Sequence, residues 1–167
     1  MRRFQSMSGL LIVMLALFVT GVSMPSAIAE ESASAPTFRG KDLDGKEYVL
    51  EQFGGSHLVL YFWATWCPAC RADTGSMKKV AAAFKPKGVQ FLSVSLDRDE
   101  NALRSFVKEN NFEYPVIFDG KGWDNAVAQK FGIVSTPTFI VIDPQGKIRG
   151  VGSWAEDLGY FLKKNIP

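Results

Sequence analysis

The sequence is poor in the residues that bind metals and cross-link small folds. Its 167 residues include only two cysteines and one histidine. Two cysteines are too few for a disulfide-stabilised scaffold. A structural zinc site takes about four ligands, so a zinc site here would have to recruit carboxylates. Two cysteines do suffice for one reversible dithiol–disulfide pair.

The chain also lacks an excess of charge of either sign. Its 19 Lys and Arg residues and 17 Asp and Glu residues give a formal net charge of +2. Arg2 and Arg3 lie in a segment that we expect to be removed, and without them 17 basic residues balance the 17 acidic ones. A neutral domain has little electrostatic attraction for nucleic acid or anionic membranes. We therefore predict no nucleic-acid partner.

The apolar run near the start of the chain is too short for a comfortable transmembrane helix, which needs about 20 residues. This run, Leu10–Val22, follows Arg2 and Arg3 and precedes the small-residue pattern of Ala27–Ala29. That three-part pattern is typical of a secretory signal. We predict a signal peptide over residues 1–29 and export to the periplasm or another extracytoplasmic compartment. An uncleaved N-terminal membrane anchor is the alternative.

The rest of the chain is predicted to form one domain. Apolar residues make up 47% of the sequence, enough for a substantial core. Residues 30–36 are small and polar and are interpreted as a flexible lead-in, and residues 37–167 as the domain. Asp44-Gly45 separates two short β-type segments, which favours an N-terminal β-hairpin.

The most informative stretch joins a strand to a helix at the two cysteines. Leu58–Trp63 is an apolar, β-branched and aromatic run typical of a buried strand. A helical pattern follows from Cys67 to Phe84. Helix N-termini stabilise anions, so the pKa of Cys67 should fall below the free-thiol value of about 8.5. Cys70 is then close enough to attack a mixed disulfide formed on Cys67.

Strands and helices alternate in the remaining chain. The patterns predict strands over Val89–Leu96, Tyr114–Asp119 and Ile148–Val151, and a further strand in the β-rich run that Pro137 directly precedes. They predict helices after Asp97–Glu100, over Trp123–Phe131 and over Ala155–Asn165. The acidic run Asp97–Glu100 favours a loop and helix N-cap over a metal site. Alternating elements that end in a β-hairpin and a helix predict a three-layer α/β/α fold.

The segment Phe62–Arg71, FWATWCPACR, resembles the active site of the thioredoxin-like proteins of the TlpA/ResA type, also called DsbE-like. These are thiol–disulfide oxidoreductases that work outside the cytoplasm. The block from Asp97 to Phe118 is similar to a central βα insertion that this family carries and plain thioredoxin lacks. The resemblance implies a thioredoxin-like fold and no cofactor beyond a Cys67–Cys70 disulfide.

The resemblance extends to the segment Thr136-Pro137-Thr138-Phe139, which is similar to the family's cis-proline loop. Frequency alone favours a trans bond, because only about 5–6% of X–Pro bonds are cis. The resemblance implies a cis bond at Pro137, beside the disulfide. It further implies that Thr136 and Pro137 contact the substrate. Trp66 and Pro68, on either side of the reactive cysteine, are predicted to contact it too, and the alternative for Trp66 is a place in the core.

The sequence offers one candidate acceptor for the proton of Cys70. Many thioredoxin-fold proteins carry a buried carboxylate six residues before the first cysteine, where this chain has Tyr61, a poor base at neutral pH. The family often has an acid three residues after the second cysteine, and here that residue is Asp73. Asp73 is therefore the candidate acceptor. The alternative is a first-turn acid that only balances the helix dipole.

Together these features predict a protein-disulfide reductase. Its clients would be proteins with disulfides or oxidised cysteines, and a membrane thiol carrier would restore its electrons. We expect a monomer. The motif does not determine whether the protein reduces client disulfides or forms them, so a disulfide-forming oxidase or isomerase is an alternative. A non-catalytic binding module also stays open and would keep its activity without Cys67 and Cys70.

Two narrower assignments have weaker support. A peroxiredoxin-like site needs a threonine three residues before the reactive cysteine, and here that residue is Ala64. The subgroup of the family that serves cytochrome c maturation has an acid after the cis-proline, and here that residue is Thr138.

Overall fold

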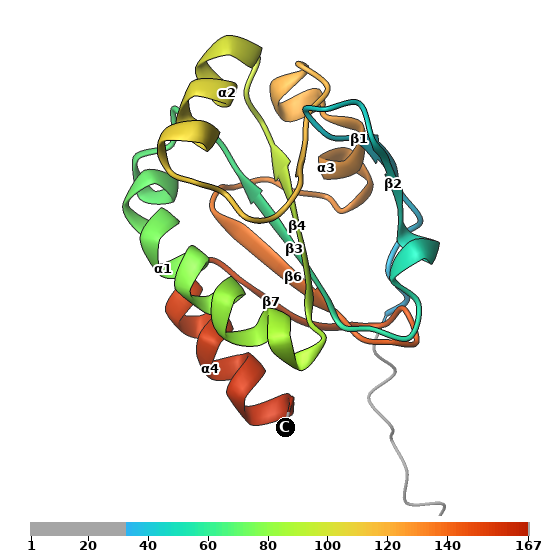
Figure 1. Cartoon of the computed structure of the whole chain (residues 1–167). Helices are drawn as coiled ribbons and strands as arrows, with labels where there is room; N and C mark the ends of the chain where they lie inside the picture. The colour runs from blue at the N-terminus through green and yellow to red at the C-terminus, as the bar shows by residue number, and fades with distance from the viewer. Residues whose placement is uncertain (1–32, 167) are drawn as a thin grey trace, which may run out of the picture. The chain divides into compact units, whose positions relative to one another are not determined.

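The computed structural model describes residues 33–166. The predicted signal peptide of residues 1–29 lies outside them. The centre of the domain is a five-stranded mixed sheet (Figure 1). In spatial order its strands are β5 (Val116–Ile117), β4 (Gln90–Ser95), β3 (Leu58–Trp63), β6 (Thr138–Ile142) and β7 (Ile148–Gly152). Strand β3 runs parallel to β4 and antiparallel to β6.

Strand β3 is the centre of the sheet, and all six of its residues are buried. Its side chains alternate between the two faces. The Phe62 ring lies 5.9 Å from that of Phe131, and the next ring, Trp63, lies 4.9 Å from Phe112. A strand covered on both faces needs apolar residues at every position. This confirms the predicted buried strand.

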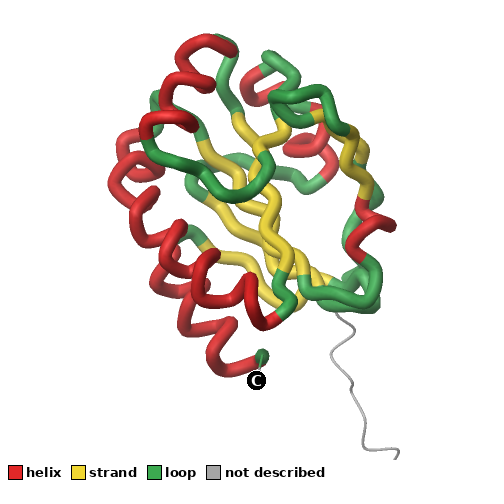
Figure 2. Tube along the Cα trace, in the orientation of Figure 1, coloured by secondary structure: helices red, strands yellow, loops and turns green. Residues whose placement is uncertain are grey.

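Helices cover both faces of the sheet and give the predicted three layers (Figures 1 and 2). Helices α1 (Pro68–Phe84) and α4 (Ala155–Asn165) lie side by side on one face. Helix α3 (Ala126–Lys130) packs with β1 (Arg39–Lys41) on the other. Short 3-10 helices occupy Leu50–Phe53 (η1), Lys85–Lys87 (η2) and Gly122–Asp124 (η3). No helix within residues 33–166 combines the length and apolar character needed to cross a membrane.

The N-terminal hairpin forms as predicted, with β1 antiparallel to β2 (Glu47–Val49). One carboxylate oxygen of Asp42 accepts the backbone N–H groups of Asp44 and Lys46, each at 2.9 Å. Gly45 has a φ of 82°, a left-handed conformation that glycine adopts without steric cost. Asp44-Gly45 therefore lies in the turn of the hairpin, as the sequence predicted.

Part of the predicted lead-in contacts the domain. Ala35 is buried, and its N–H donates to the carbonyl of Gly146 in the β6–β7 turn at 2.8 Å. Ser34 forms a β-bridge with Lys147 in the same turn. The described end of the lead-in is therefore held against the sheet.

The central insertion consists of α2 (Glu100–Glu109) and β5. The predicted N-cap is Asp99, which accepts the N–H groups of Asn101 and Ala102 at 2.9 and 3.1 Å. Strand β5 then pairs parallel to β4. The insertion therefore extends the sheet on the β4 side.

The predicted helix over Trp123–Phe131 is wrong as one element. It divides into η3 and α3 at Asn125, whose φ and ψ of −53° and 127° are not helical. The buried Asn125 side chain accepts the N–H groups of Val127 and Ala128 and so begins a new helix. Asparagine competes with helical hydrogen bonding in this way, so it caps helices better than it continues them.

Candidate active site

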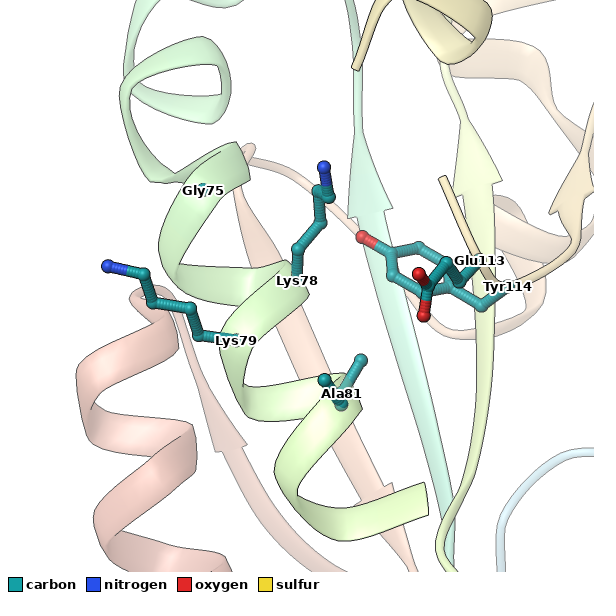
Figure 3. A pocket seen from close by; sticks show the side chains of 7 residues that line it. Gly75, Lys78, Lys79, Ala81, Glu113 and Tyr114 are labelled. Atoms are coloured by element: carbon teal, nitrogen blue, oxygen red, sulfur yellow. The ribbon is translucent and has the colours of Figure 1, made fainter. Parts of the chain in front are cut away.

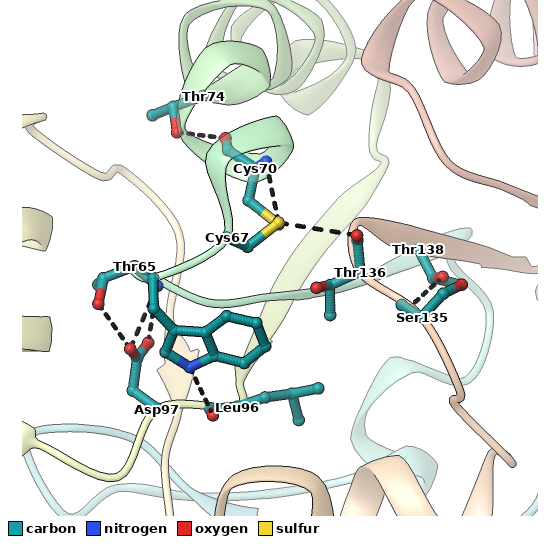
Figure 4. Close-up of a disulfide and its surroundings, with 10 residues drawn as sticks. Thr65, Cys67, Cys70, Thr74, Leu96, Asp97, Ser135, Thr136 and Thr138 are labelled. Carbon is teal, nitrogen blue, oxygen red and sulfur yellow. Dashed lines mark hydrogen bonds between the residues drawn. A yellow bond between two sulfur atoms is a disulfide. The ribbon is translucent and has the colours of Figure 1, made fainter.

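The two cysteines form a disulfide at the junction of β3 and α1. Cys67 is the N-cap of α1, and its Sγ accepts the N–H of Cys70 at 3.2 Å (Figure 4). Pro68 occupies the first helical position, where the absence of an N–H costs nothing. Cys70 is fully buried, and Cys67 is 4% exposed. The predicted strand–cysteine–helix arrangement is confirmed.

The loop before β6 lies against this disulfide. The Thr136–Pro137 peptide bond is cis, as the resemblance implied. The carbonyl oxygen of Thr136 is 3.6 Å from Cys67 Sγ (Figure 4). The hydroxyl of Thr138 donates to the carbonyl of Ser135 at 2.8 Å and closes the loop. Two segments 69 residues apart thus meet at the sulfur atom of Cys67.

Trp66 lies beside Cys67 and is 52% exposed. Its Nε1 donates to the carbonyl of Leu96 at 3.3 Å, which fixes the indole over the end of β4. Its ring centroid lies 6.0 Å from that of Trp123, at an interplanar angle of 55°. A large apolar surface therefore stands next to the disulfide.

A buried carboxylate that the sequence did not identify as part of the site holds the loop before Cys67. Asp97 accepts the backbone N–H of Thr65 at 3.0 Å and the Thr65 hydroxyl at 2.6 Å (Figure 4). The Ser95 hydroxyl donates to Asp97 at 2.7 Å and accepts its N–H at 3.0 Å. The sequence placed Asp97 in a loop or cap, and the available signal for its role was its position directly after a predicted strand, two residues beyond Ser95.

Asp73 lies on α1, one turn after Cys70, and is buried. Its Oδ2 accepts the N–H of Ala155, the first residue of α4, at 2.8 Å. The first turn of α1 contains no acidic residue, so the alternative of a first-turn acid is wrong. Burial raises the pKa of Asp73 above its ordinary value of 3.8, the bond from Ala155 opposes that effect, and nearby Asp157 adds to it.

Two tyrosine hydroxyls share the interior behind α1. The hydroxyls of Tyr61 and Tyr114 are buried without a hydrogen-bond partner in the described protein. Burial raises the pKa of both tyrosines, and the nearby Asp73 carboxylate raises both further. Tyr61 therefore stays protonated near neutral pH even more firmly than an ordinary tyrosine and has no charged form available to accept a proton, which agrees with the sequence-based expectation.

A cavity of about 370 Å³ opens between α1 and the segment before β5 (Figure 3). Its lining residues are Gly75, Lys78, Lys79, Ala81, Ala82, Glu113 and Tyr114. None of the predicted site residues lines it.

Within residues 33–166, no cluster of three or more His, Cys, Asp or Glu side chains could hold a metal ion.

Comparisons with known proteins agree with this geometry. The model of the AhpC/TSA family matches residues 32–151. The thiol-disulfide oxidoreductase ResA of Bacillus thuringiensis subsp. konkukian is 33% identical over 142 residues, which cover 83% of this chain and 80% of that protein.

Solved structures show the same fold. The thioredoxin domain of a thiol-disulfide oxidoreductase from Bacteroides vulgatus superposes with a TM-score of 0.74 at 30% identity, over 81% of this chain and 97% of that one. A putative thiol:disulfide interchange protein DsbE from Chlorobium tepidum has a TM-score of 0.69 at 28% identity, over 80% and 92% of the two chains. This chain therefore belongs to the thioredoxin-like AhpC/TSA family and is a thiol-disulfide oxidoreductase of the TlpA/ResA type.

Proposed function

We propose that this protein reduces disulfides of client proteins outside the cytoplasm, with Cys67 as the nucleophile and Cys70 as the resolving thiol. The observation that carries the proposal is the position of Cys67 Sγ. It accepts the Cys70 N–H at 3.2 Å at the N-terminus of α1 and lies 3.6 Å from the Thr136 carbonyl. In the reduced protein, the same N–H and the helix dipole stabilise a Cys67 thiolate.

The reaction has two exchange steps. The Cys67 thiolate attacks one sulfur of a client disulfide, and the other client sulfur leaves as a thiolate. Cys70 then gives up its proton and attacks Cys67 Sγ, so the mixed disulfide breaks and the second client thiolate leaves. The client gains two electrons, and Cys67 and Cys70 become a disulfide. An oxidised cysteine that has formed a mixed disulfide with a small thiol is reduced by the same route.

Asp73 is proposed as the acceptor of the Cys70 proton. It lies one turn along α1 from this thiol, in the same buried layer. Because burial raises its pKa, the carboxylate is a stronger base than an exposed aspartate. Proton transfer is easiest when the pKa values of donor and acceptor are close.

Client binding is assigned to the surface around Cys67. Trp66 and Pro68 are exposed on one side of the disulfide, and the cis-proline loop lies on the other. Thr136 is half-buried, and its backbone offers hydrogen-bonding groups to an extended chain. An extended client segment that pairs with this loop brings its sulfur to Cys67.

Each turnover leaves the protein oxidised, so a second partner must supply two electrons. We assign this role to a membrane protein that presents a dithiol on the outer face of the membrane. The support is the leader-like pattern of residues 1–29, which predicts an extracytoplasmic location. An oxidising compartment lacks the soluble reductants of the cytoplasm.

The reduction potential of the Cys67–Cys70 pair tests the proposal. The domain is equilibrated in graded dithiothreitol buffers, and free thiols are trapped and counted by mass spectrometry. A potential near or below about −220 mV fits a reductase that needs a dedicated donor. A potential near about −120 mV would instead make the protein an oxidant of secreted thiols. The Cys67→Ser and Cys70→Ser variants are the controls, because neither can form the pair.

A further inference from the structure

We infer that Trp123 and Trp66 together form an apolar subsite that selects clients with an aromatic or large apolar side chain next to the reacting cysteine. The inference rests on the proposed function, because it specifies which segments enter that site. Trp66 precedes Cys67 in the sequence motif, whereas Trp123 comes from η3 and stands outside every motif of the sequence.

The exposure of the two rings is the first observation. Trp66 is 52% exposed and Trp123 is 39% exposed. Their centroids lie 6.0 Å apart at 55°, a tilted arrangement. Contiguous exposed aromatic surface on a small domain commonly marks an interaction site. Trp and Tyr dominate such sites because their rigid rings lose little entropy on binding.

Both rings stand on fixed supports. The Trp66 indole donates to the carbonyl of Leu96, and the preceding residue, Thr65, is held by the buried carboxylate of Asp97. The carbonyl of Trp123 accepts the side-chain N–H of Gln129 on α3 at 2.8 Å. A subsite that is already in place when the client arrives does not spend binding energy on ordering its own loops.

The subsite is continuous with the disulfide, and this identifies its occupant. Cys67 is only 4% exposed, between the exposed Trp66 and the Thr136 loop. With so little of Cys67 exposed beside a ring that is half exposed, a flat folded surface has poor access to its sulfur. A flexible segment can insert its cysteine sulfur, and the side chains flanking that cysteine then lie over the two rings. The occupant is therefore an unfolded client segment.

The charges around Trp123 favour an apolar occupant. Asp124 follows Trp123 in η3, and its carboxylate lies 3.7 Å from the guanidinium of Arg98, in the loop after β4. Opposite charges at this distance largely offset each other's field toward solvent. The subsite therefore does not select acidic or basic flanking residues.

Two peptide probes test this selectivity. Each carries one cysteine as a mixed disulfide with glutathione; Trp and Leu flank the cysteine in one, and Ser and Asn in the other. The Cys67 thiolate attacks the peptide sulfur and releases glutathione thiolate. Cys70 then attacks Cys67 Sγ, and the peptide thiol leaves as the pair is oxidised. The released peptide is quantified by chromatography under single-turnover conditions.

We expect the reduced protein to release the Trp–Leu peptide about ten times faster than the Ser–Asn peptide. Trp123→Ala should remove most of this preference, and Trp123→Phe should keep most of it because a ring remains. Tyr160→Ala is the matched control. Tyr160 is an exposed aromatic on α4 that no proposal places at the disulfide, so its removal should leave the preference unchanged.

The outcomes separate the inference from the proposed function. If wild-type protein reduces both peptides at the same rate, the inference is wrong and the reductase proposal stands. If it reduces neither peptide and no glutathione disulfide, the reductase proposal is wrong. An equal slowing of both peptides by Trp123→Ala would reveal a structural role for Trp123 and overturn the inference. A wild-type dimer that Trp123→Ala dissociates in sedimentation would assign the rings to self-association and overturn it too.

Discussion

Asp73 is a carboxylate buried between α1 and α4, where a charge is costly to maintain. Its charged form gains the hydrogen bond from Ala155 N–H but also faces Asp157, an acid on α4. The net effect of these surroundings is a raised pKa. Such a balance between the protonated and the charged form suits a residue that accepts and returns a proton, because neither form is strongly favoured over the other.

Replacing Asp73 with asparagine should slow the second exchange step. Asparagine keeps the size of the side chain and an oxygen that can accept from Ala155, but it cannot accept the Cys70 proton. We expect resolution of the mixed disulfide to slow about tenfold to a hundredfold at pH 7, with the first step unchanged. Quenched-flow trapping of the mixed disulfide measures both rates. An unchanged resolution rate would contradict the role of Asp73.

The same substitution predicts a pH dependence of stability. Because the pKa of Asp73 is raised in the folded protein, folding favours its protonated form. The stabilisation from Asp73 is therefore fully present below the unfolded value of about 3.8 and is lost as pH rises through the raised pKa. Asp73→Asn should lose less stability than the wild type when the pH rises from 3.5 to 7.5. Urea denaturation at both pH values measures this, and equal losses would contradict the prediction.

At the scale of elements, two nearby aspartates have different tasks. Asp99 caps the first turn of α2, on the surface. Asp97 joins the end of β4 to the loop between β3 and α1, in the interior. Only Asp97 therefore holds the segment that carries Cys67 in position. Sequence spacing alone could not separate them, because both follow the same strand.

Alanine substitutions should therefore differ in cost. Asp97→Ala leaves the Thr65 N–H and two hydroxyls without their acceptor, so we expect the free energy of unfolding to fall by about 2–4 kcal/mol. Asp99→Ala removes an exposed cap and should cost about 1 kcal/mol. Urea denaturation of the oxidised protein measures both. An equal or reversed order would mean that the Asp97 hydrogen bonds do not anchor the loop.

At the scale of the whole molecule, the sheet brings distant segments to one edge. β3 lies between β4 and β6, so the loops after β3 and β4 and before β6 meet around Cys67. The carboxyl ends of parallel strands commonly gather functional loops in this way. Helices α1 and α4 lie side by side on one face of this sheet (Figure 1).

The proposed extracytoplasmic location is a property of the whole chain, because it depends on the predicted signal peptide of residues 1–29. In a bacterial host with two membranes, we expect the 167-residue chain to be exported and cleaved after Ala29, so that the released protein begins at Glu30. Intact-mass spectrometry of the periplasmic and membrane fractions measures this. A membrane-bound product that retains Met1 would indicate an uncleaved anchor instead.

Replacing Arg2 and Arg3 with glutamate should impair export, because the positive region starts insertion.

Local patterns were sufficient for most elements. The buried strand at Leu58–Trp63, the helix after Cys67 and the closing helix at Ala155–Asn165 follow from periodicity and turn residues, and the structure confirms them. These signals act over a few residues, so they can be seen in the sequence. The cis bond at Pro137 was predicted from family resemblance and not from residue frequency. The break at Asn125 was missed because asparagine can lie within a helix as well as cap one, and the helical spacing of the apolar residues did not separate the two.

Tertiary structure decided how these pieces act together. Cys67 meets Thr136 across 69 positions of sequence, and Asp73 meets Ala155 across 82. The ring contact of Trp66 with Trp123 likewise joins separate elements. Such pairs depend on strand order and helix packing, which arise from burial of the whole core and leave no local pattern. The sequence by itself determined the redox chemistry at Cys67 and Cys70, and the fold determined which carboxylate and which aromatic rings surround it.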